Sequence, residues 1–266
     1  LAHEIEAWLV ARGRQVWVAS SWAEDQVYHA MPETDLVITL GGDGSLLRAA
    51  RLAAPHRALL FGVNLGRLGF LAECAPENWQ GPLARLLAGD YWIEERMMLS
   101  VDTLRDQEVI GQHLALNDVV ISRGTLARAI QLRTYVDGEY LATYYADGLI
   151  VSTATGSTAY SLAVGGPILP PELRSILIIP IAPHLSMDRA VVLAQGVQVE
   201  SQVRTDHQAI LTVDGQYEFD LRSGDCVRVT ASSHVSRFAR VQPRSYFYRA
   251  LLARLVPAEA APGNEE

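Results

Sequence analysis

One short segment constrains the fold of this chain most strongly: an apolar run that leads directly into a glycine-rich turn. Residues 36–40 form a continuous, largely β-branched stretch, which is typical of a strand buried on both faces of a sheet. The turn at 41–45 has the sequence Gly-Gly-Asp-Gly-Ser, and residues 46–54 have the pattern of a helix. Residues 58–63 predict a second buried strand. The order strand, turn, helix, strand predicts a parallel α/β layer.

The pattern changes after residue 98, where alternating apolar residues begin to predominate. The other elements predicted before this point are helices at 4–11 and 82–87 and a short strand at 16–18. Beyond it, Asp137-Gly138 and Asp214-Gly215 predict two hairpins. Further along, residues 226–230 predict one more strand. The second part of the chain is therefore expected to be rich in β-structure.

These patterns predict two domains and a tail. We expect an α/β domain over residues 1–95 and a β-rich domain over residues 96–244. A terminal helix at about 245–256 is expected to pack back on the first domain. Residues 257–266 are small and acidic, and are expected to be disordered.

Composition excludes several classes of function. The chain has 266 residues, of which 49% are hydrophobic and 20% charged, so it can bury a sizeable core. Its net charge of −8 does not favour nucleic acid or anionic membranes as partners, and we expect neither. All 22 basic residues are arginine. The lack of lysine excludes a Walker-type phosphate loop and any lysine base.

The cysteines and the hydropathy pattern suggest a cellular location. Only Cys74 and Cys226 occur, far apart, which excludes a disulfide framework and a zinc-ligand spacing. We find no signal peptide and no apolar run of about 18 residues. We therefore expect a cytoplasmic protein with reduced cysteines.

Asp43, in the middle of the glycine-rich turn, is the residue that most strongly indicates chemistry. Three glycines let the backbone approach a phosphate, and a helix beginning near Ser45 would point free N–H groups towards it. Because a carboxylate repels phosphate, Asp43 indicates a base for a hydroxyl or a metal contact. The alternative is a tight turn in which Asp43 caps the helix.

Three further segments carry polar residues between apolar ones. The glycine-rich segment 62–71 follows the next strand, so it is expected to share a crevice with the first turn. Asn117-Asp118 places an amide and a carboxylate among β-branched residues, either in a site or at a strand end. Segment 147–160 runs from a strand into a hydroxyl-rich turn before a short helix at 160–163. Its hydroxyls could bind a ligand or simply line a buried turn.

Taken together, these segments resemble the bacterial NAD kinase family. The matching segments, in chain order, are 41–45, 62–71, 117–118, 147–167, 180–184 and 214–216. Lipid kinases of the diacylglycerol type share the first turn, whereas the segment 147–167 is specific to the family. The resemblance implies a Rossmann-like α/β N-terminal domain with a parallel sheet, of the NAD kinase/diacylglycerol kinase type, and a β-rich C-terminal domain that binds NAD.

The resemblance also implies roles for individual residues. Asp43 would be the general base on the 2′-hydroxyl of the adenosine ribose, with Arg48 as a phosphate contact. Asn117 and Asp118 would hold the adenosine portion, and Asp147 would contact substrate. The expected nucleotide-binding residues are Gly42, Asp43, Gly44, Arg48, Asn117, Asp118, Arg128, Tyr145, Asp147, Thr155, Thr158, Ala159, Tyr160, Ser161, Leu162, Ala163 and Gln216. His184 lies in a matching segment and is expected to be structural.

The chain departs from the family pattern in three places. Asp118 replaces the usual Glu, which makes the side chain one methylene shorter, and Ser45 replaces the commoner Thr. The family begins with a strand and a glycine-containing turn, whereas this chain begins at a predicted helix. We expect that strand to belong in the middle of the N-terminal sheet, and the N-terminus to be truncated.

The resemblance predicts the transfer of the terminal phosphate of ATP, or of another polyphosphate donor, to NAD to give NADP. Mg²⁺ or another divalent ion would arrive with the donor. NAD and the donor are thus the expected partners, in a homodimer or homotetramer whose sites are shared between subunits. Two alternatives remain: a lipid kinase of the diacylglycerol kinase type, and an NAD(P) sensor without catalysis.

Overall fold

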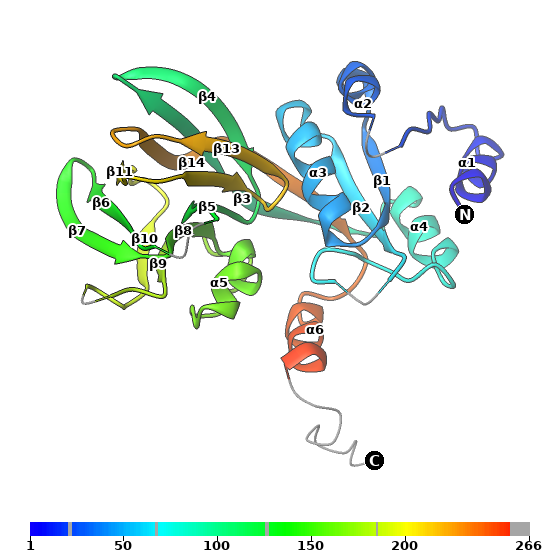
Figure 1. Ribbon diagram of the computed structural model, residues 1–266. Helices are drawn as coiled ribbons and strands as arrows, with labels where there is room; N and C mark the ends of the chain where they lie inside the picture. The colour runs from blue at the N-terminus through cyan, green and yellow to red at the C-terminus, as the bar shows by residue number, and fades with distance from the viewer. Residues whose placement is uncertain (21–22, 67–68, 126–127, 185, 256–266) are drawn as a thin grey trace, which may run out of the picture. The chain divides into compact units, whose positions relative to one another are not determined.

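The chain divides into two units, each with its own contacts (Figure 1). The computed structural model describes residues 1–20, 23–66, 69–125, 128–184 and 186–255. One unit comprises Leu1–Glu94 with Arg237–Glu266, and the other comprises Glu95–Ser236. Strand β3 (Trp92–Arg105) leads into the second unit and β14 (Cys226–Arg240) leads back. The predicted tail and residue 256 of the predicted terminal helix lie outside the described residues.

The first unit contains the predicted parallel layer. Strand β1 (Leu36–Gly41) pairs in parallel with β2 (Leu59–Asn64), and β2 pairs in parallel with the last residues of β14. Helix α3 (Asp43–Ala53) joins β1 to β2 and packs against both strands. The parallel α/β layer is therefore confirmed.

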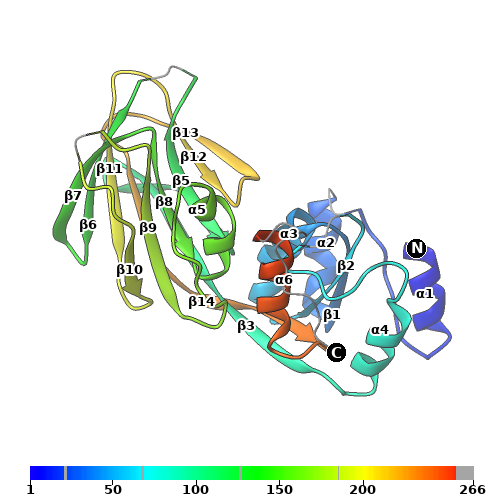
Figure 2. The same ribbon diagram turned by 90° about the horizontal axis from the view of Figure 1, so that it is seen from below.

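Helices cover both faces of this layer (Figures 1 and 2). The helices besides α3 are α1 (Ala2–Val10), α2 (Glu24–Ala30), α4 (Gln80–Leu87) and α6 (Tyr246–Leu255), with short 3-10 turns at Met31–Glu33 and Ala54–His56. The alternate residues Leu36, Ile38 and Leu40 of β1 pack with apolar residues of α1 and α4. α3 lies on the opposite face, where its own apolar residues are buried.

Two elements of this unit differ from the sequence prediction. Residues 16–18 do not form a strand, because they pair with no other strand in the described part of the chain. The Trp17 indole N–H instead donates a hydrogen bond to Thr34 Oγ1 at 3.0 Å. Helix α2 was not predicted, and Val27 is its only described residue that is buried.

The second unit is built from antiparallel strands. Its strands besides β3 and β14 are β4 (Glu108–Ala115), β5 (Asp118–Arg123), β6 (Ile130–Val136), β7 (Glu139–Ala146), β8 (Gly148–Thr153), β9 (Ser175–Ile181), β10 (Val191–Ala194), β11 (Val199–Arg204), β12 (Ala209–Val213) and β13 (Tyr217–Leu221). One six-stranded sheet has the order β10-β9-β8-β5-β12-β13. The other sheet runs β14-β11-β6-β7 within this unit, and β3 pairs with β4. Apolar residues of both sheets form one shared core.

Both predicted hairpins are confirmed. Asp137 and Gly138 join β6 to β7 with φ of 50° and 82°, and Asp214 and Gly215 follow β12 with φ of 51° and 62°. Such left-handed pairs match the twist of the flanking strands. Strand β14 extends to Arg240, ten residues beyond the predicted end at residue 230. The short helix α5 (Tyr160–Ala163) packs against β8 (Figure 2).

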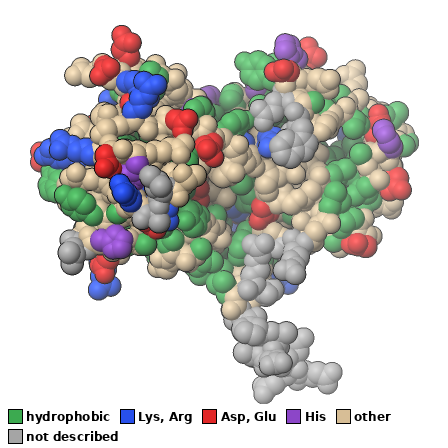
Figure 3. Space-filling model, in the orientation of Figure 1, with side chains coloured by type: hydrophobic (Ala, Val, Ile, Leu, Met, Phe, Trp, Pro, Cys, Tyr) green, Lys and Arg blue, Asp and Glu red, His purple; other side chains and the backbone are tan. Residues whose placement is uncertain are grey.

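The surface carries a mixture of side-chain types. On the face drawn in Figure 3, acidic and basic side chains are interspersed with hydrophobic and uncharged ones. Exposed aromatic side chains include Tyr140 and Tyr145 of β7. Within the described ranges, no helix is both long and apolar enough to cross a membrane.

Candidate active site

The neighbouring loop orients Asp43 in the glycine-rich turn. Helix α3 begins at Asp43 with Gly42 as its N-cap residue, and no side chain caps it. The Asp43 carboxylate instead accepts hydrogen bonds from the backbone N–H groups of Phe70, to Oδ2 at 2.9 Å, and of Leu71, to Oδ1 at 3.2 Å. The alternative in which Asp43 caps its own helix is therefore wrong. The helix starts before Ser45 because the Gly42 carbonyl already accepts its first hydrogen bond.

Two glycines near Asp43 differ in the space around them. A Cβ atom at Gly69 would overlap the Asp43 carboxylate, so the close approach of loop and carboxylate requires glycine there. A Cβ atom at Gly42 would have no neighbour within 4 Å. The turn is thus closely packed on the side of Gly69 and open at Gly42, where a phosphate could approach the backbone.

The loop that orients Asp43 is fixed to strand β2. The Glu73 N–H donates to the Gly62 carbonyl at 2.8 Å, and the Asn64 N–H donates to the Cys74 carbonyl at 2.9 Å. Residues 67–68, inside the second predicted glycine-rich segment, lie outside the described residues. The residues that follow, from Gly69 to Cys74, therefore lie beside β2, and the N–H groups of Phe70 and Leu71 point to Asp43.

The other predicted residues of the first unit lie on the same turn and helix. Gly44 is exposed in the first turn of α3, and Arg48 is half-buried further along the helix. An eleven-residue helix carries a partial positive charge at its N-terminus. These features suit a phosphate group near Gly42 and Gly44.

In the second unit, Asp214 organises the segment that contains Asn117 and Asp118. Its carboxylate accepts hydrogen bonds from three consecutive backbone N–H groups: Leu116 at 3.1 Å, Asn117 at 2.8 Å and Asp118 at 3.2 Å. The Asp214 N–H in turn donates to the Asp118 carbonyl at 2.9 Å. The hairpin turn after β12 therefore determines the backbone course at the start of β5.

Asp118 has an unusual electrostatic environment. Its side chain is buried, with 5% exposed. Burial, and secondarily the negative charge of Asp214, raises the pKa of Asp118 to about 7, while a hydrogen bond from the Tyr160 N–H opposes the rise. Near neutral pH this carboxyl group can therefore either donate or accept a hydrogen bond.

Asp147 is held by an arginine on the neighbouring strand. Its carboxylate Oδ1 lies 2.9 Å from Arg123 Nε, and its carbonyl accepts a hydrogen bond from the Arg123 N–H at 2.9 Å. The predicted substrate contact at Asp147 therefore sits in an ion pair that fixes its orientation.

Hydroxyls at the end of β8 and in the turn that follows it bind the protein backbone. Ser152 Oγ donates to the Asn117 carbonyl at 3.0 Å, and Thr153 Oγ1 donates to the Leu116 carbonyl at 2.6 Å. Ser157 Oγ donates to the Ala154 carbonyl at 2.7 Å. For these three residues the structural interpretation of the hydroxyl-rich turn is the one that the contacts support.

The predicted nucleotide-binding residues of this segment lie just before α5 and within it. Thr155 is buried, and Thr158 Oγ1 donates to the Thr155 carbonyl at 3.1 Å. Tyr160 is 46% exposed, whereas Ser161 is fully buried and its Oγ has no partner among the described residues. The remaining predicted members, Ala159, Leu162 and Ala163, are half-buried or exposed around the same helix. The Tyr160 N–H links this group to Asp118.

The last three predicted contacts lie at strand ends. Arg128 precedes β6, and its carbonyl accepts a hydrogen bond from His207 Nε2 at 3.0 Å. Tyr145, on β7, is 49% exposed, and its carbonyl accepts a hydrogen bond from the His184 N–H at 2.6 Å. Gln216 is half-buried in the turn after Asp214.

Segments 62–71 and 214–216 were singled out from the sequence, but the specific roles of their residues were not predicted. Gly69, the N–H groups of Phe70 and Leu71, and the Asp214 carboxylate orient the predicted residues from elsewhere in the chain. The glycine-rich segment and the Asp-Gly turn were visible as motifs, but only their contacts reveal what they hold. No cluster of three or more His, Cys, Asp or Glu side chains arranged to bind a metal is found among the residues described.

Comparison with known proteins matches both units. Residues 1–91 match the family described as the ATP-NAD kinase N-terminal domain, and residues 116–241 match the ATP-NAD kinase C-terminal domain. The chain is 42% identical to the NAD kinase of Chloroflexus aggregans over 255 residues, which cover 96% of this chain and 92% of that protein. It is also 42% identical to the NAD kinase of Citrifermentans bemidjiense over 262 residues, covering 93% and 90% of the two chains.

Solved structures of an NADH kinase and an NAD kinase have a fold similar to that of this chain. The crystal structure of yeast NADH kinase complexed with NADH has a TM-score of 0.79 at 26% identity, covering 88% of this chain and 69% of that chain. An NAD kinase from Archaeoglobus fulgidus in complex with ATP has a TM-score of 0.71 at 27% identity, covering 83% and 85%. Fold and sequence thus define a kinase that acts on a nucleotide.

The chain belongs to the NAD kinase family, and its reaction is the phosphorylation of NAD with ATP. The predicted family, fold class and activity are confirmed. Of the three hypotheses that the sequence left open, these matches support the NAD kinase, not the lipid kinase or the sensor.

Proposed function

We propose that Asp43 accepts the proton of the 2′-hydroxyl on the adenosine ribose of NAD. As that oxygen bonds to the terminal phosphorus of ATP, the bond from this phosphorus to the bridging oxygen breaks, and ADP and NADP result. The observation that carries the proposal is the Asp43 carboxylate, fixed by two backbone N–H groups at the start of α3. A base held in one orientation suits phosphoryl transfer, which depends on positioning.

The polyphosphate chain is proposed to lie against the glycine-rich turn. The open space at Gly42, the exposed Gly44 and the N-terminus of α3 support this placement. Arg48 would add a positive charge, since this chain has no lysine to supply one. A divalent ion such as Mg²⁺ would enter as part of the substrate, bound to the phosphates of the donor.

NAD is proposed to bind through the cluster of Asn117, Asp118 and the residues around α5. The tight organisation of this cluster by Asp214 supports the proposal, because a fixed backbone presents polar groups in one arrangement. The carboxyl group of Asp118, with its pKa raised to about 7 by burial, could hydrogen-bond a ribose hydroxyl in either protonation state. Arg128, Tyr145, Asp147 and Gln216 are proposed as further contacts.

We also propose that the chain forms a homodimer or homotetramer with shared sites. Strand β7 ends its sheet and exposes the side chains of Tyr140 and Tyr145. The Tyr145 backbone already bonds to His184 and Ser186, so the end of β7 near Tyr140 is where another chain would pair. Light scattering at micromolar concentration would show a multiple of the mass of one chain, 29.1 kDa. A monomer with full activity would contradict the proposal.

A cytoplasmic location completes the proposal. Burial raises the pKa of the Cys74 thiol to about 12 and that of Cys226 to about 11, and both cysteines are free. Thiols that stay protonated resist oxidation, and free cysteines of this kind are compatible with a reducing compartment.

Steady-state kinetics of Asp43→Asn test the assignment of the base. The amide keeps the size of the side chain and one oxygen acceptor, but it cannot take the proton. We expect kcat to fall by about 10³-fold, within the range for loss of a general base, with NAD binding by calorimetry nearly unchanged. Asp90→Asn is the control, since Asp90 pairs with Arg85 on the surface. Equal turnover in the two variants would refute the assignment.

A coupled assay tests the acceptor and the donor. NADP formed from NAD and MgATP is read with an NADP-specific dehydrogenase, and inorganic polyphosphate replaces ATP in a parallel reaction. The proposal predicts no turnover with a 2′-deoxyadenosine analogue of NAD. Phosphorylation of that analogue would place the acceptor hydroxyl elsewhere.

A further inference from the structure

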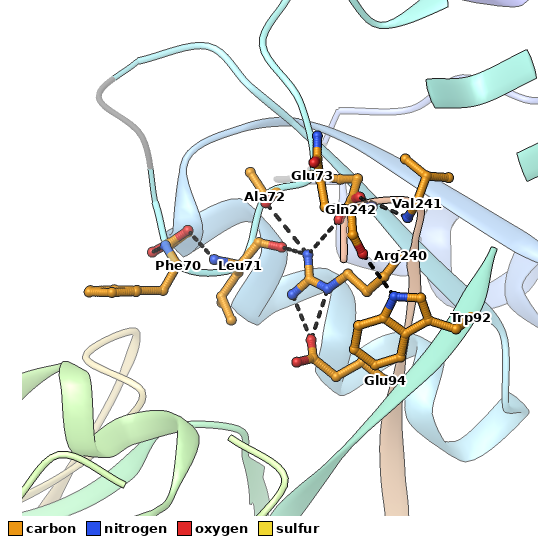
Figure 4. Close-up of polar contacts among 10 residues, drawn as sticks. Phe70, Leu71, Ala72, Glu73, Trp92, Glu94, Arg240, Val241 and Gln242 are labelled. Carbon is orange, nitrogen blue, oxygen red and sulfur yellow. Dashed lines mark hydrogen bonds and ion pairs between the residues drawn. The ribbon is translucent and has the colours of Figure 1, made fainter. Parts of the chain in front are cut away.

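Arg240 lies in a buried ionic cluster at the end of β14 (Figure 4). Only 6% of its surface is exposed, and Glu73 and Glu94 beside it are 1% and 6% exposed. Arg240 Nε donates to Glu94 Oε2 at 2.8 Å, and Nη1 lies 3.2 Å from Glu73 Oε2. Burying three charged groups is costly unless all are paired, so this arrangement depends on the complete set.

The same guanidinium reaches the loop that holds Asp43. Arg240 Nη1 donates to the Leu71 carbonyl at 2.7 Å, while the Leu71 N–H donates to Asp43 Oδ1 at 3.2 Å. One residue thus connects the arginine to the carboxylate through its two backbone polar groups. Figure 4 shows the Leu71 carbonyl directed towards the guanidinium, with the Glu94 carboxylate below it.

Glu73 holds the loop at a second point. Its Oε1 accepts hydrogen bonds from the N–H groups of Val241 at 2.8 Å and Gln242 at 2.7 Å. Its own N–H bonds to Gly62 on β2. Glu73 therefore anchors the loop both to β2 and to the residues that follow β14. Arg240 holds the same loop at the Leu71 carbonyl.

We propose that Arg240 is a positioning residue for Asp43, acting through the carbonyl of Leu71. By holding the Leu71 carbonyl it restrains the backbone of the residue whose N–H, together with that of Phe70, orients the carboxylate. Arg240 itself is buried. The inference rests on the proposed role of Asp43 as the base. Weakening the cluster should therefore lower kcat while leaving the Michaelis constants for NAD and ATP nearly unchanged.

Arg240→Lys tests the proposal. The single ammonium group of lysine cannot bind Glu94, Glu73 and Leu71 together, as the planar guanidinium group does. We expect kcat to fall by about 10-fold or more, since small errors in position are costly in rate, with both KM values within about twofold. Amide hydrogen exchange at Phe70 and Leu71 should accelerate. The matched control is Arg105→Lys, which breaks a two-point pair with Asp225 (2.8 and 2.7 Å) in the other unit. It should leave kcat unchanged.

A double-mutant cycle separates positioning from general destabilisation. In the Asp43→Asn background, Arg240→Lys should change the residual kcat by less than about twofold, because the residue it positions no longer acts. A full, multiplicative loss there would overturn the proposal, as would an unchanged kcat in the single variant. If Asp43→Asn alone keeps its turnover, the role of Asp43 fails instead. If Arg240→Lys does not fold, Glu94→Gln replaces it with the same expectations.

Discussion

Asp43 and Gly69 are packed so closely that a Cβ atom on Gly69 would overlap the Asp43 carboxylate. The two residues come from the two glycine-rich segments of the first unit. Their contact brings the N–H groups of Phe70 and Leu71 within hydrogen-bonding distance of the carboxylate. A glycine in one loop thus determines where the acidic group of the other can lie.

Gly69→Ala should displace the Asp43 side chain and leave the fold largely intact. The group in conflict is the end of a side chain, which can rotate away, so the cost in stability should be small. We expect kcat to fall by about 100-fold, the loss that a displacement of about 1 Å can produce. Gly66→Ala is the control, since a Cβ atom there meets nothing within 4 Å. Comparable kcat values in the two variants would argue against a role for the contact.

Gly42→Ala should affect the binding of ATP rather than the position of Asp43. Gly42 has φ −89° and ψ −172°, which alanine adopts readily, and its Cβ would meet no protein atom within 4 Å. The loss of stability should therefore be limited to the cost of alanine at an N-cap position, about 1 kcal/mol or less, while the methyl group would obstruct the approach of phosphate to the backbone. We expect KM for ATP to rise by about 10-fold or more. Gly81→Ala, also open, should leave KM unaltered; a normal KM for Gly42→Ala would place the phosphates elsewhere.

Asp118 should make the stability of the protein depend on pH. Burial raises the pKa of Asp118 to about 7 in the folded state, whereas it is about 4 in an unfolded chain. Between these values the folded state binds more protons, so the free energy of unfolding falls as pH rises and then levels off above about 7. Asp118→Asn removes the ionisable group, and with it this fall in the free energy of unfolding.

The Asp118→Asn variant should therefore be more stable than the parent at pH 8, by an amount on the order of 3–4 kcal/mol. The difference should shrink as pH falls and vanish near pH 4. Urea unfolding at several pH values measures it. A difference that stays constant from pH 4 to pH 8 would mean that the pKa of Asp118 is not raised.

The elements that the sequence predicts correctly are those with strong local signals. The strand before the glycine turn and the Asp137-Gly138 hairpin depend on neighbouring residues alone, and both are present. Residues 16–18 look like a strand, but a strand needs a partner that composition cannot reveal. Strand β14 continues to Arg240 through polar residues because it leads from one unit to the other.

For the candidate site, the motif located Asp43 but not its surroundings. Its hydrogen bond to Phe70 joins residues 27 positions apart, and the bond from Arg240 to Leu71 spans 169 positions. Arg240 stands between Ala239 and Val241 in a segment that also contains Arg237 and Gln242, so its local sequence does not mark it as buried. Its partners depend on tertiary packing and cannot be read from spacing.

Asp214 should be important for stability as well as for NAD binding. Asp214→Ala leaves three backbone N–H groups without their acceptor and places alanine at φ 51°. We expect a loss on the order of 3 kcal/mol or more in the free energy of unfolding. Asp214→Asn keeps an oxygen and tolerates a positive φ, so it should lose less. Chemical denaturation measures both; equal losses would show that the acceptor does not matter.

The most direct test of the central claim is a single-turnover measurement on Asp43→Asn. Enzyme in excess over NAD is mixed with ATP labelled in the terminal phosphate, and labelled NADP is counted after acid quenching. The proposed mechanism predicts that NAD still binds while transfer slows by about 10³-fold. Transfer at a rate within tenfold of the parent enzyme would show that Asp43 is not the base.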